Sequence, residues 1–237
     1  MPLSPTFEKY EVEQEYESAQ VNIIMCSADD LYKFEEIIAD SVNNNTKNVK
    51  MVVIFDGKSD KFLTFDKLLE EGRGEALKQI PHFDINPEKD MLFMIHTSGS
   101  SGRPKCALLP HRLFLQGATD LADLTGVAKG AIIGVIFPFG HISGTTFIPI
   151  QIIIGSTVVV FGHFDEELLM KSIEKYRIKG MPLFPNVGRR FIEGNLAKKY
   201  DLSSLEVIST GGAAFPGNIA KAMIDKYNVK FREGLDF

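Results

Sequence analysis

A short loop rich in serine and glycine, Thr97-Ser-Gly-Ser-Ser-Gly-Arg-Pro-Lys105, has residue types and spacing that suit the binding of a polyphosphate. Gly99 and Gly102 have no side chains, so backbone N–H groups can approach an anion there and φ can be positive. Lys105 adds a mobile positive charge. Hydroxyl donors are available at Thr97, Ser98, Ser100 and Ser101. The composition alone also allows a flexible surface loop.

The loop differs from two widespread phosphate-binding motifs. A Walker A loop has a longer gap between its glycines and a Lys-Ser/Thr pair directly after the second glycine. Here two residues separate Gly99 from Gly102, and Cys106 follows Lys105. The G-x-G-x-x-G pattern of dinucleotide-binding proteins is absent as well. The loop is therefore neither a P-loop nor a dinucleotide fingerprint.

Two further segments carry candidate site residues. His141 lies in a loop broken by proline and glycine, where its imidazole can reach a pocket, and Ser143 is a second candidate for the lining of that pocket. Read alone, a histidine in such a loop is more often structural. Gly211 and Gly212 precede Ala213 in a turn between an apolar run and an amphipathic run; small residues there satisfy a tight turn and also let a flat ligand approach the backbone.

The elements that position these residues alternate between strands and helices. Short runs rich in Val, Ile and Phe predict strands at 21–25, 49–55, 91–96, 131–137, 157–161 and 205–209. Helical patterns lie at 29–41, 165–176 and 216–227, the last with Pro216 at its first position. This order predicts an α/β fold with mixed, largely parallel sheets and flanking helices. Such sheets bind ligands at the carboxyl ends of their strands, where we expect both glycine-rich turns.

Composition and charge exclude several classes of protein. A net charge of -5 with intermixed signs gives no basic face for nucleic acid. Two cysteines, Cys26 and Cys106, are too few for a disulfide framework and indicate reduced thiols inside a cell. The apolar stretch 147–161 is too short and too interrupted for a membrane span, and reads as a buried helix end followed by a buried strand. No targeting signal is visible in the sequence. We expect an intracellular protein, either cytoplasmic or peroxisomal.

The segment from His96 to Arg112, HTSGSSGRPKCALLPHR, resembles the core signature of the adenylate-forming superfamily, which includes acyl-CoA synthetases, 4-coumarate–CoA ligases and beetle luciferases. Ser101 replaces a threonine of the family pattern, and Cys106 replaces a glycine. The resemblance continues in register at Phe137–Gly144, similar to the family's Pro-x-x-His segment, and at Ser209–Phe215, similar to its Ser-Gly-Gly-Ala-Pro-Leu turn. The luciferase and 4-coumarate–CoA ligase branch is the one it resembles most.

This resemblance implies a function and roles for the residues. ATP would activate a carboxylic acid to an acyl adenylate, and the thiol of CoA would then form a thioester. Residues 97–105 would hold phosphates, Gly211–Ala213 would flank the nucleotide, and His141 would lie beside the acyl group as the catalytic candidate. Family members also use Mg²⁺. The implied partners are the acid, ATP and CoA, with no nucleic acid and no membrane span.

The sequence also departs from the family near its end. The family has Gly-Tyr-Gly-x-Thr-Glu, whose glutamate holds Mg²⁺, where this chain reads Phe231-Arg-Glu-Gly-Leu-Asp-Phe237. We therefore expect residues 1–237 to be part of the large domain, without the small C-terminal domain. Two alternatives to an active ligase remain: a catalytically incompetent remnant that binds nucleotide or acyl groups, and a luciferase-like monooxygenase relative.

Overall fold

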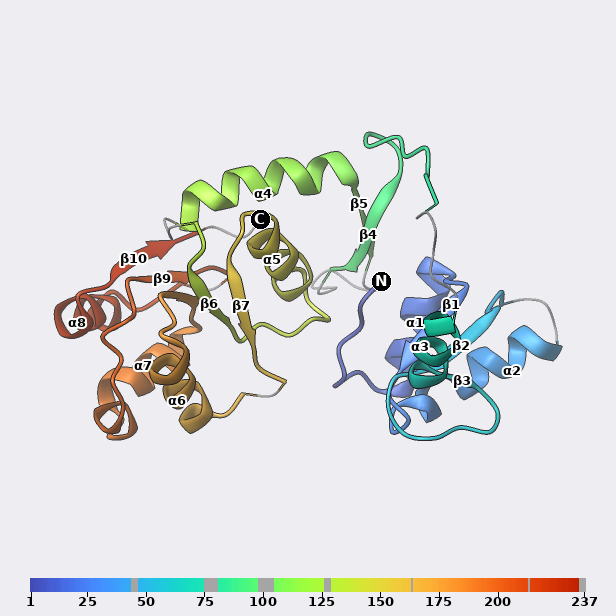
Figure 1. Cartoon of the computed structure of the whole chain (residues 1–237), viewed down its shortest axis with the longest axis horizontal. Helices are drawn as coiled ribbons and strands as arrows, with labels where there is room; N and C mark the ends of the chain where they lie inside the picture. The colour runs from blue at the N-terminus through green and yellow to red at the C-terminus, as the bar shows by residue number, and fades with distance from the viewer. Residues whose placement is uncertain are drawn as a thin grey trace. The chain divides into compact units, whose positions relative to one another are not determined.

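The computed structural model describes residues 1–43, 47–74, 81–97, 105–125, 129–162, 164–212 and 214–234, with the backbone alone at 119–125. The chain is mixed α/β, as the sequence predicts, and forms two compact units (Figure 1). We call them the N-terminal unit (Met1–His111) and the C-terminal unit (Arg112–Phe237).

The N-terminal unit is built on a parallel sheet of order β1-β2-β3. Its elements are α1 (Lys9–Ala19), β1 (Ile23–Cys26), the 3₁₀ helix η1 (Leu31–Phe34), α2 (Glu35–Asn43), β2 (Met51–Ile54), β3 (Leu63–Thr64), α3 (Phe65–Gly74), β4 (Met91–His96) and β5 (Cys106–Pro110). Alternation along β1 buries Ile24 and Cys26 and leaves Ile23 and Met25 exposed. The buried residues pack with side chains of α1 and α2 in one apolar cluster.

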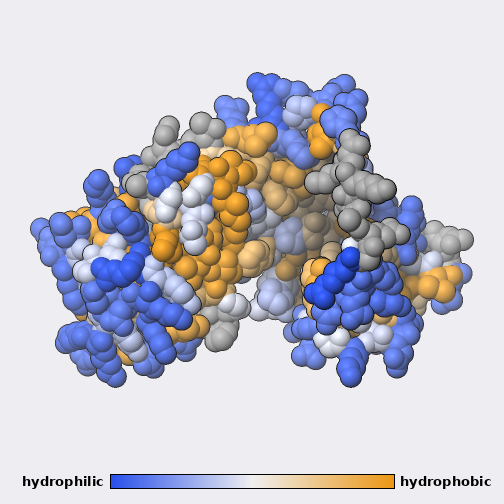
Figure 2. Space-filling model, viewed as in Figure 1, coloured by the Kyte–Doolittle hydropathy of each residue, from blue (hydrophilic) through white to orange (hydrophobic). Residues whose placement is uncertain are grey.

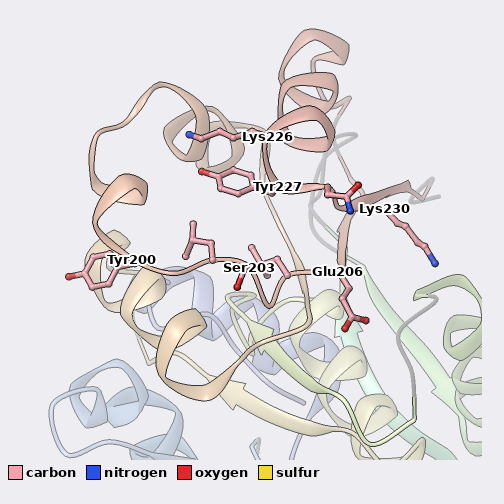
Figure 3. Close-up of a pocket in the computed structure, with 9 residues that line it drawn as sticks. Tyr200, Ser203, Glu206, Lys226, Tyr227 and Lys230 are labelled. Atoms are coloured by element: carbon pink, nitrogen blue, oxygen red, sulfur yellow. The ribbon is translucent and has the colours of Figure 1, made fainter.

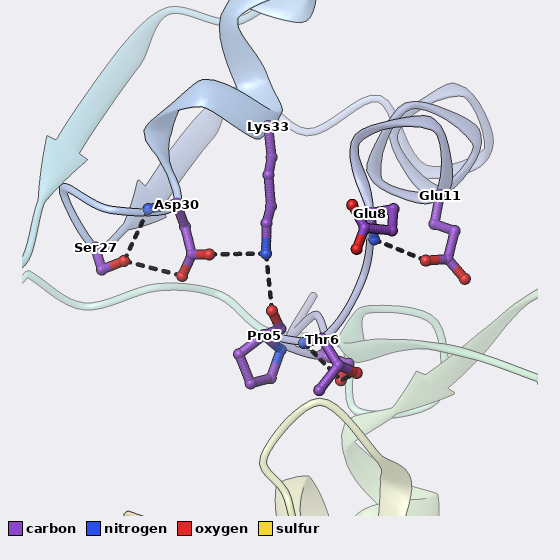
Figure 4. Close-up of polar contacts among 8 residues, drawn as sticks. Pro5, Thr6, Glu8, Glu11, Ser27, Asp30 and Lys33 are labelled. Carbon is purple, nitrogen blue, oxygen red and sulfur yellow. Dashed lines mark hydrogen bonds and ion pairs between the residues drawn. The ribbon is translucent and has the colours of Figure 1, made fainter.

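The buried side chain of Lys33 hydrogen-bonds the first residues of the chain, at Pro5, to this unit (Figure 4). Lys33 Nζ donates to the carbonyl of Pro5 and lies 2.8 Å from both that oxygen and Asp30 Oδ1. The hydrogen bond from Lys33 holds the pKa of Asp30 below its usual range. Ser27 Oγ donates to the other carboxylate oxygen of Asp30 at 2.9 Å. The lysine charge is thus fully paired although it is buried, which is the condition for its burial to be tolerated.

The serine-rich loop connects β4 and β5, which pair as a two-stranded antiparallel sheet. The prediction that this loop lies at the carboxyl edge of a parallel sheet is wrong, because β4 pairs only with the antiparallel β5 among the described residues. A second strand, β5, intervenes before α4 (His111–Thr125) begins. The segment therefore folds as a hairpin with a long loop.

The C-terminal unit contains a five-stranded parallel sheet of order β10-β9-β8-β6-β7. Besides α4, its elements are β6 (Ile132–Val135), α5 (Ile142–Ile153), β7 (Thr157–Val160), α6 (Glu166–Tyr176), β8 (Gly180–Pro182), α7 (Pro185–Glu193), the 3₁₀ helix η2 (Leu196–Lys199), β9 (Val207–Thr210), α8 (Gly217–Tyr227) and β10 (Lys230–Glu233). This alternation of strand and helix is the predicted architecture.

Alternation along the strands divides the buried residues between the two faces of this sheet. Ile133 and Val135 of β6 pack with Phe147 and Ile148 of α5. Ile132, on the other face of β6, packs against the larger cluster that α6, α7 and α8 form. Helix α5 therefore covers one face of the sheet, and α6 to α8 cover the other.

Strand β7 lies at the edge of the sheet, beside β6. Figure 2 shows hydrophobic side chains on the surface over α5 and β7, where Ile152, Ile153 and Val160 are exposed. The prediction of a buried strand at 157–161 is wrong, because an edge strand leaves part of its surface uncovered. Among the described residues, no helix is both long and apolar enough to cross a bilayer.

Candidate functional site

The ends of the serine-rich loop are joined by two hydrogen bonds between Thr97 and Lys105. The N–H of Thr97 donates to the carbonyl of Lys105 at 3.0 Å, and the N–H of Lys105 donates to Thr97 Oγ1 at 3.1 Å. We call this pair the loop clasp. Both residues are exposed. Since Thr97 Oγ1 accepts a backbone N–H, its own proton stays available to an anion.

Several residues predicted for phosphate binding lie outside the described part of the chain: Ser98, Gly99, Ser100, Ser101 and Gly102, together with Ala213 of the other turn. Their roles stay predictions. What the structure adds is the hairpin that carries them and the clasp at its base.

The residue just before the loop clasp, His96, belongs to a buried polar cluster with Glu15 and Ser18. The imidazole of His96 contacts Glu15 Oε2 of α1 through Nδ1, and its Nε2 lies 2.7 Å from Ser18 Oγ. The side chains of His96 and Glu15 are 7% and 4% exposed. Ser18 Oγ also donates to the Glu15 carbonyl at 2.8 Å, so the imidazole N–H is left to donate to Ser18.

Burial changes the protonation of this pair. Burial raises the pKa of Glu15 to about 7, and burial lowers the pKa of His96. Both shifts favour the uncharged forms, a protonated Glu15 carboxyl beside a neutral imidazole. Sequence reasoning missed this pair, because Glu15 and His96 are far apart in the chain and no spacing pattern links them. It ties α1 to the root of the loop.

His141 is exposed at the N-terminus of α5, as its N-cap residue. Its Nδ1 accepts the N–H of Ser143 at 3.3 Å and lies 2.8 Å from Ser143 Oγ. A neutral ring with this arrangement carries its proton on Nε2, which can then donate to a ligand. Ser143 thus orients the imidazole.

Gly144 makes this turn possible. A Cβ added there would lie 2.2 Å from the carbonyl oxygen of Pro138, far inside contact distance. The same turn is closed by His141 N–H, which donates to Pro138, and by Thr145 Oγ1, which donates to Phe139 at 2.6 Å. Only glycine fits where the loop after β6 folds back onto the first turn of α5.

Gly211 and Gly212 follow the last residue of β9 and precede α8, as the sequence predicts. Gly212 has φ +72°, a conformation that strongly favours glycine. Thr210, the last residue of β9, is buried, and its Oγ1 has no hydrogen-bond partner in the described part of the chain. The turn therefore combines an approachable backbone with a buried hydroxyl.

The structure brings His141 and the glycine turn to the same edge of one sheet. His141 follows the carboxyl end of β6, Gly211 follows that of β9, and only β8 separates the two strands. Adjacent strands are about 4.8 Å apart, so the two segments begin about 10 Å from each other. This edge is where doubly wound sheets bind ligands. The loop clasp belongs to the N-terminal unit.

Another cavity lies at the opposite edge of the sheet. It has about 610 Å³ and is lined by polar side chains that include Tyr200, Ser203, Glu206, Lys226, Tyr227 and Lys230 (Figure 3). Glu206 immediately precedes β9 and Lys230 begins β10, so these are the amino ends of the strands. Lys226 and Tyr227 both donate to the carbonyl of Phe191. Their polar groups are engaged in packing α8 against α7.

Among the residues with described positions, no group of three or more His, Cys, Asp or Glu could hold a metal ion. Cys26 and Cys106 are free thiols.

The sequence is similar to that of known enzymes over most of its length. The profile of the AMP-binding enzymes matches residues 1–234. Acyl-CoA synthetase 7 of Caenorhabditis elegans is 27% identical over 92% of this chain and 41% of its own length. Luciferin 4-monooxygenase of Photinus pyralis is 28% identical over 76% of this chain and 34% of its own length. The chain thus spans less than half the length of these relatives.

Solved structures share the fold. The N-terminal domain of FACL13 from Mycobacterium tuberculosis, in an inhibitor-bound crystal structure, covers the whole of this chain with a TM-score of 0.82 and 19% identity. This chain in turn covers 56% of that domain. At this identity the likeness establishes the architecture.

Proposed function

Since the chain belongs to the family of AMP-binding enzymes, we propose that its site serves the ATP-dependent activation of a carboxylic acid. In this reaction a carboxylate oxygen attacks the α-phosphorus of ATP, the bond to the β-phosphate oxygen breaks, and pyrophosphate leaves. The product is an acyl adenylate. The thiol of CoA then loses its proton to water and attacks the acyl carbon as the thiolate, a thioester forms, and AMP leaves with the electron pair of the broken bond.

The observation that carries the proposal is the arrangement of His141 and Gly211–Gly212 at one sheet edge. The glycine turn offers backbone close to which a flat nucleotide base or an acyl group can lie. The Nε2–H of His141 offers a hydrogen bond to the carboxylate or the acyl oxygen. The catalysis of such a transfer is mainly positioning and charge neutralisation, which these groups can provide.

The loop clasp supports the proposed role of residues 97–105 in holding the phosphates of ATP. The clasp fixes both ends of the loop, which lowers the conformational entropy lost when a phosphate binds. The Thr97 hydroxyl can donate, and Lys105 is exposed next to it. Bound Mg²⁺ would neutralise part of the negative charge of the phosphates, and we propose that ATP brings this ion into the site.

The full reaction depends on residues beyond those described. We propose that residues 1–237 correspond to part of the large domain of the family, and that CoA capture requires a further domain. The alternative, a catalytically incompetent protein that binds nucleotide or acyl groups, makes a different prediction for pyrophosphate exchange. A luciferase-like oxidation would in addition consume oxygen.

The experiment is an isotope-exchange assay with the purified chain. Labelled pyrophosphate is incorporated into ATP only if an acid and ATP react reversibly to the acyl adenylate. We expect exchange that depends on an added acid from a panel of aliphatic and aromatic acids. ATP binding without any acid-dependent exchange would support the incompetent alternative instead.

The loop is tested by Lys105→Ala, with Lys89→Ala, also exposed in the N-terminal unit, as the matched control. Loss of a charge-assisted contact to phosphate is worth about 1.5–3 kcal/mol, so ATP affinity should fall roughly 10- to 100-fold in Lys105→Ala. The control should bind ATP as the wild type does. Equal ATP affinity in all three proteins would remove Lys105 from the site.

A further inference from the structure

Three polar side chains of the N-terminal unit lie in a row, in the order hydroxyl, imidazole and carboxyl. Ser18 Oγ lies 2.7 Å from His96 Nε2, and His96 Nδ1 contacts a carboxyl oxygen of Glu15. Ser18 is exposed, whereas the side chains of His96 and Glu15 are buried. A nucleophile within hydrogen-bond reach of a base, which a third group orients, is the arrangement that activates a serine. We call these three residues the serine row.

The serine row is built on regular elements, which fix the positions of its side chains. Ser18 is the second-last residue of α1, and Glu15 lies three residues before it, so both side chains are on the same side of the helix. His96 is the last residue of β4 and pairs with Cys106 of β5. Because Ser18 lies at the end of its helix, its hydroxyl is accessible to a molecule from solution.

An apolar strip continues from the serine row along the β4-β5 hairpin. Alternate residues of a strand share a face, so the directly paired Met94 and Leu108 lie on the face of His96, about 7 Å further along the strands. Leu108 is 54% exposed. An acyl chain that lies along this strip covers the exposed leucine while its carbonyl carbon remains near Ser18. The strip therefore favours an apolar acyl group.

The position of the ring proton decides whether the serine is activated. While Glu15 is uncharged, the Ser18 hydroxyl donates to the carbonyl of Glu15 at 2.8 Å and receives the N–H of His96 Nε2. Once Glu15 is ionised, its carboxylate holds the ring proton on Nδ1, which leaves Nε2 as an acceptor. The hydroxyl of Ser18 then turns toward Nε2. In this state the row has the proton arrangement of a Ser-His-carboxylate triad.

We propose that Ser18 is a nucleophile for acyl transfer, with His96 as its general base and Glu15 as the residue that positions the imidazole. The acyl donor is an activated ester of an apolar carboxylic acid. Ser18 Oγ attacks the carbonyl carbon, and its proton passes to His96 Nε2. The bond from this carbon to the ester oxygen breaks, and the leaving oxygen takes the electron pair and then the proton from His96. An ester of Ser18 and a free alcohol result, without any use of ATP or of the glycine turn.

The ionisation of Glu15 makes this reactivity depend on pH. Burial raises the pKa of Glu15 to about 7, so the serine row is activated as the pH rises through 7. The titratable groups that face the cluster include Glu11 of α1, Cys106 of β5 and the amino group of Met1. Burial raises the pKa of Cys106 and lowers the pKa of the amino group. Glu15→Gln separates the effect of Glu15 from the effects of these neighbours.

An alkyl fluorophosphonate tests the nucleophile in the full chain, because an activated serine displaces its fluoride and keeps the phosphonyl group. Mass spectrometry of peptides should find the label on Ser18, with a rate that rises between about pH 6 and 8. His96→Gln should slow the labelling roughly 100-fold, the usual contribution of a general base. Glu15→Gln should slow it as well and remove the rise with pH. Ser203→Ala, at an exposed position of the C-terminal unit, is the control and should be labelled as the wild type is.

Release of nitrophenolate from 4-nitrophenyl hexanoate and from 4-nitrophenyl acetate measures the acyl transfer itself. We expect the hexanoate to react about tenfold faster, since only its longer chain covers Leu108. Leu108→Ala should reduce this preference, and Ser18→Ala should lower the reaction to the rate of His96→Gln. Circular dichroism checks that each variant is folded.

Several results would overturn the role of Ser18. They are the absence of label on Ser18 at every pH, labelling of Ser203 as fast as that of Ser18, and labelling of Ser18 that His96→Gln leaves unchanged. Label on Ser18 together with an unchanged release of nitrophenolate in Ser18→Ala would also contradict acyl transfer by this residue. None of these results bears on ATP binding or on pyrophosphate exchange, so the proposed function is tested separately.

Discussion

At the scale of single residues, Gly144 allows the tight turn that places His141 at the N-cap of α5. The carbonyl of Pro138 occupies the space of a Cβ at this position. We expect Gly144→Ala to lower the free energy of unfolding by about 1–3 kcal/mol, the usual cost of overpacking. Urea denaturation measures this change.

The matched control for Gly144→Ala is Gly117→Ala in α4, where no atom lies within 4 Å of the added Cβ. Alanine is the better helix former by about 0.5–1 kcal/mol, so this variant should be slightly more stable than the wild type. If both variants changed stability in the same direction, the close approach at Pro138 would not be what requires glycine at 144.

The pair of Glu15 and His96 makes stability depend on pH. The folded protein raises the pKa of Glu15 to about 7 from 4.5, so the folded state holds its proton more tightly than the unfolded state. This contribution is fully present below about pH 4.5 and is lost as the pH rises through 7. His96, whose pKa is lowered by burial, acts in the opposite direction below its ordinary value of 6.5.

Glu15→Gln isolates the carboxyl from these opposing effects. Relative to this variant, the wild type should lose stability between pH 4.5 and 7, as measured by urea denaturation at several pH values. Glu17→Gln, at an exposed position of the same helix, should follow the wild-type profile. A constant difference between the wild type and Glu15→Gln across this range would show that Glu15 is ionised when buried.

Some residues of the candidate site can be predicted from the sequence, and others are recognised only in the structure. His141 and Gly211–Gly212 were predicted as site residues because motifs in the chain mark them, and the structure places them at one edge of the sheet. Glu15 and Ser18 were not found. Their significance comes from burial and from neighbours distant in the sequence, which no local pattern encodes.

At the scale of elements, the N-terminus of α5 has both a structural and a chemical use for His141. Its side chain caps the helix by accepting the N–H of Ser143. His141→Ala should therefore lose about 1 kcal/mol of stability, whereas His141→Asn should keep the cap, because asparagine is a good N-cap residue. Urea denaturation distinguishes the two variants.

Acid-dependent pyrophosphate exchange reports the chemical use of the same residue. Both His141 variants remove the imidazole N–H, so exchange should fall roughly 10- to 100-fold in each, the loss of one hydrogen bond to a charged group. If His141→Asn exchanged at the wild-type rate, the cap alone would account for the residue.

Helices and strands were predicted correctly where a short stretch of sequence has a clear pattern of its own. Strands rich in Val and Ile, such as β2 and β6, were predicted at nearly their observed positions, because β-branched runs are typical of buried strands. Strand β5 was missed, since its partly exposed residues do not alternate. Helix α5 was predicted only at its end, because Pro149 and the apolar residues around the helix hide a helical pattern. Pro216 proved to be the N-cap of α8, one residue before the predicted place.

At the scale of the whole molecule, the described residues form separate apolar cores in the two units. Ile37 is buried in the N-terminal unit and Leu169 in the C-terminal unit. We expect Ile37→Ala and Leu169→Ala to cost about 2–5 kcal/mol each, and each to speed amide hydrogen exchange mainly in its own unit. Exchange that rises equally in both units in either variant would show one cooperative structure instead.

The edge position of β7 has a consequence for handling the protein. An exposed edge with apolar side chains is a template for pairing with another chain, and the run Thr157-Val-Val-Val160 has strong β propensity and no charge. Concentrated samples should therefore aggregate through this strand, with scattering that grows with time. Val160→Lys, at an exposed position, should delay this growth without lowering the free energy of unfolding. A lysine at this edge would then be a practical route to soluble protein for the assays above.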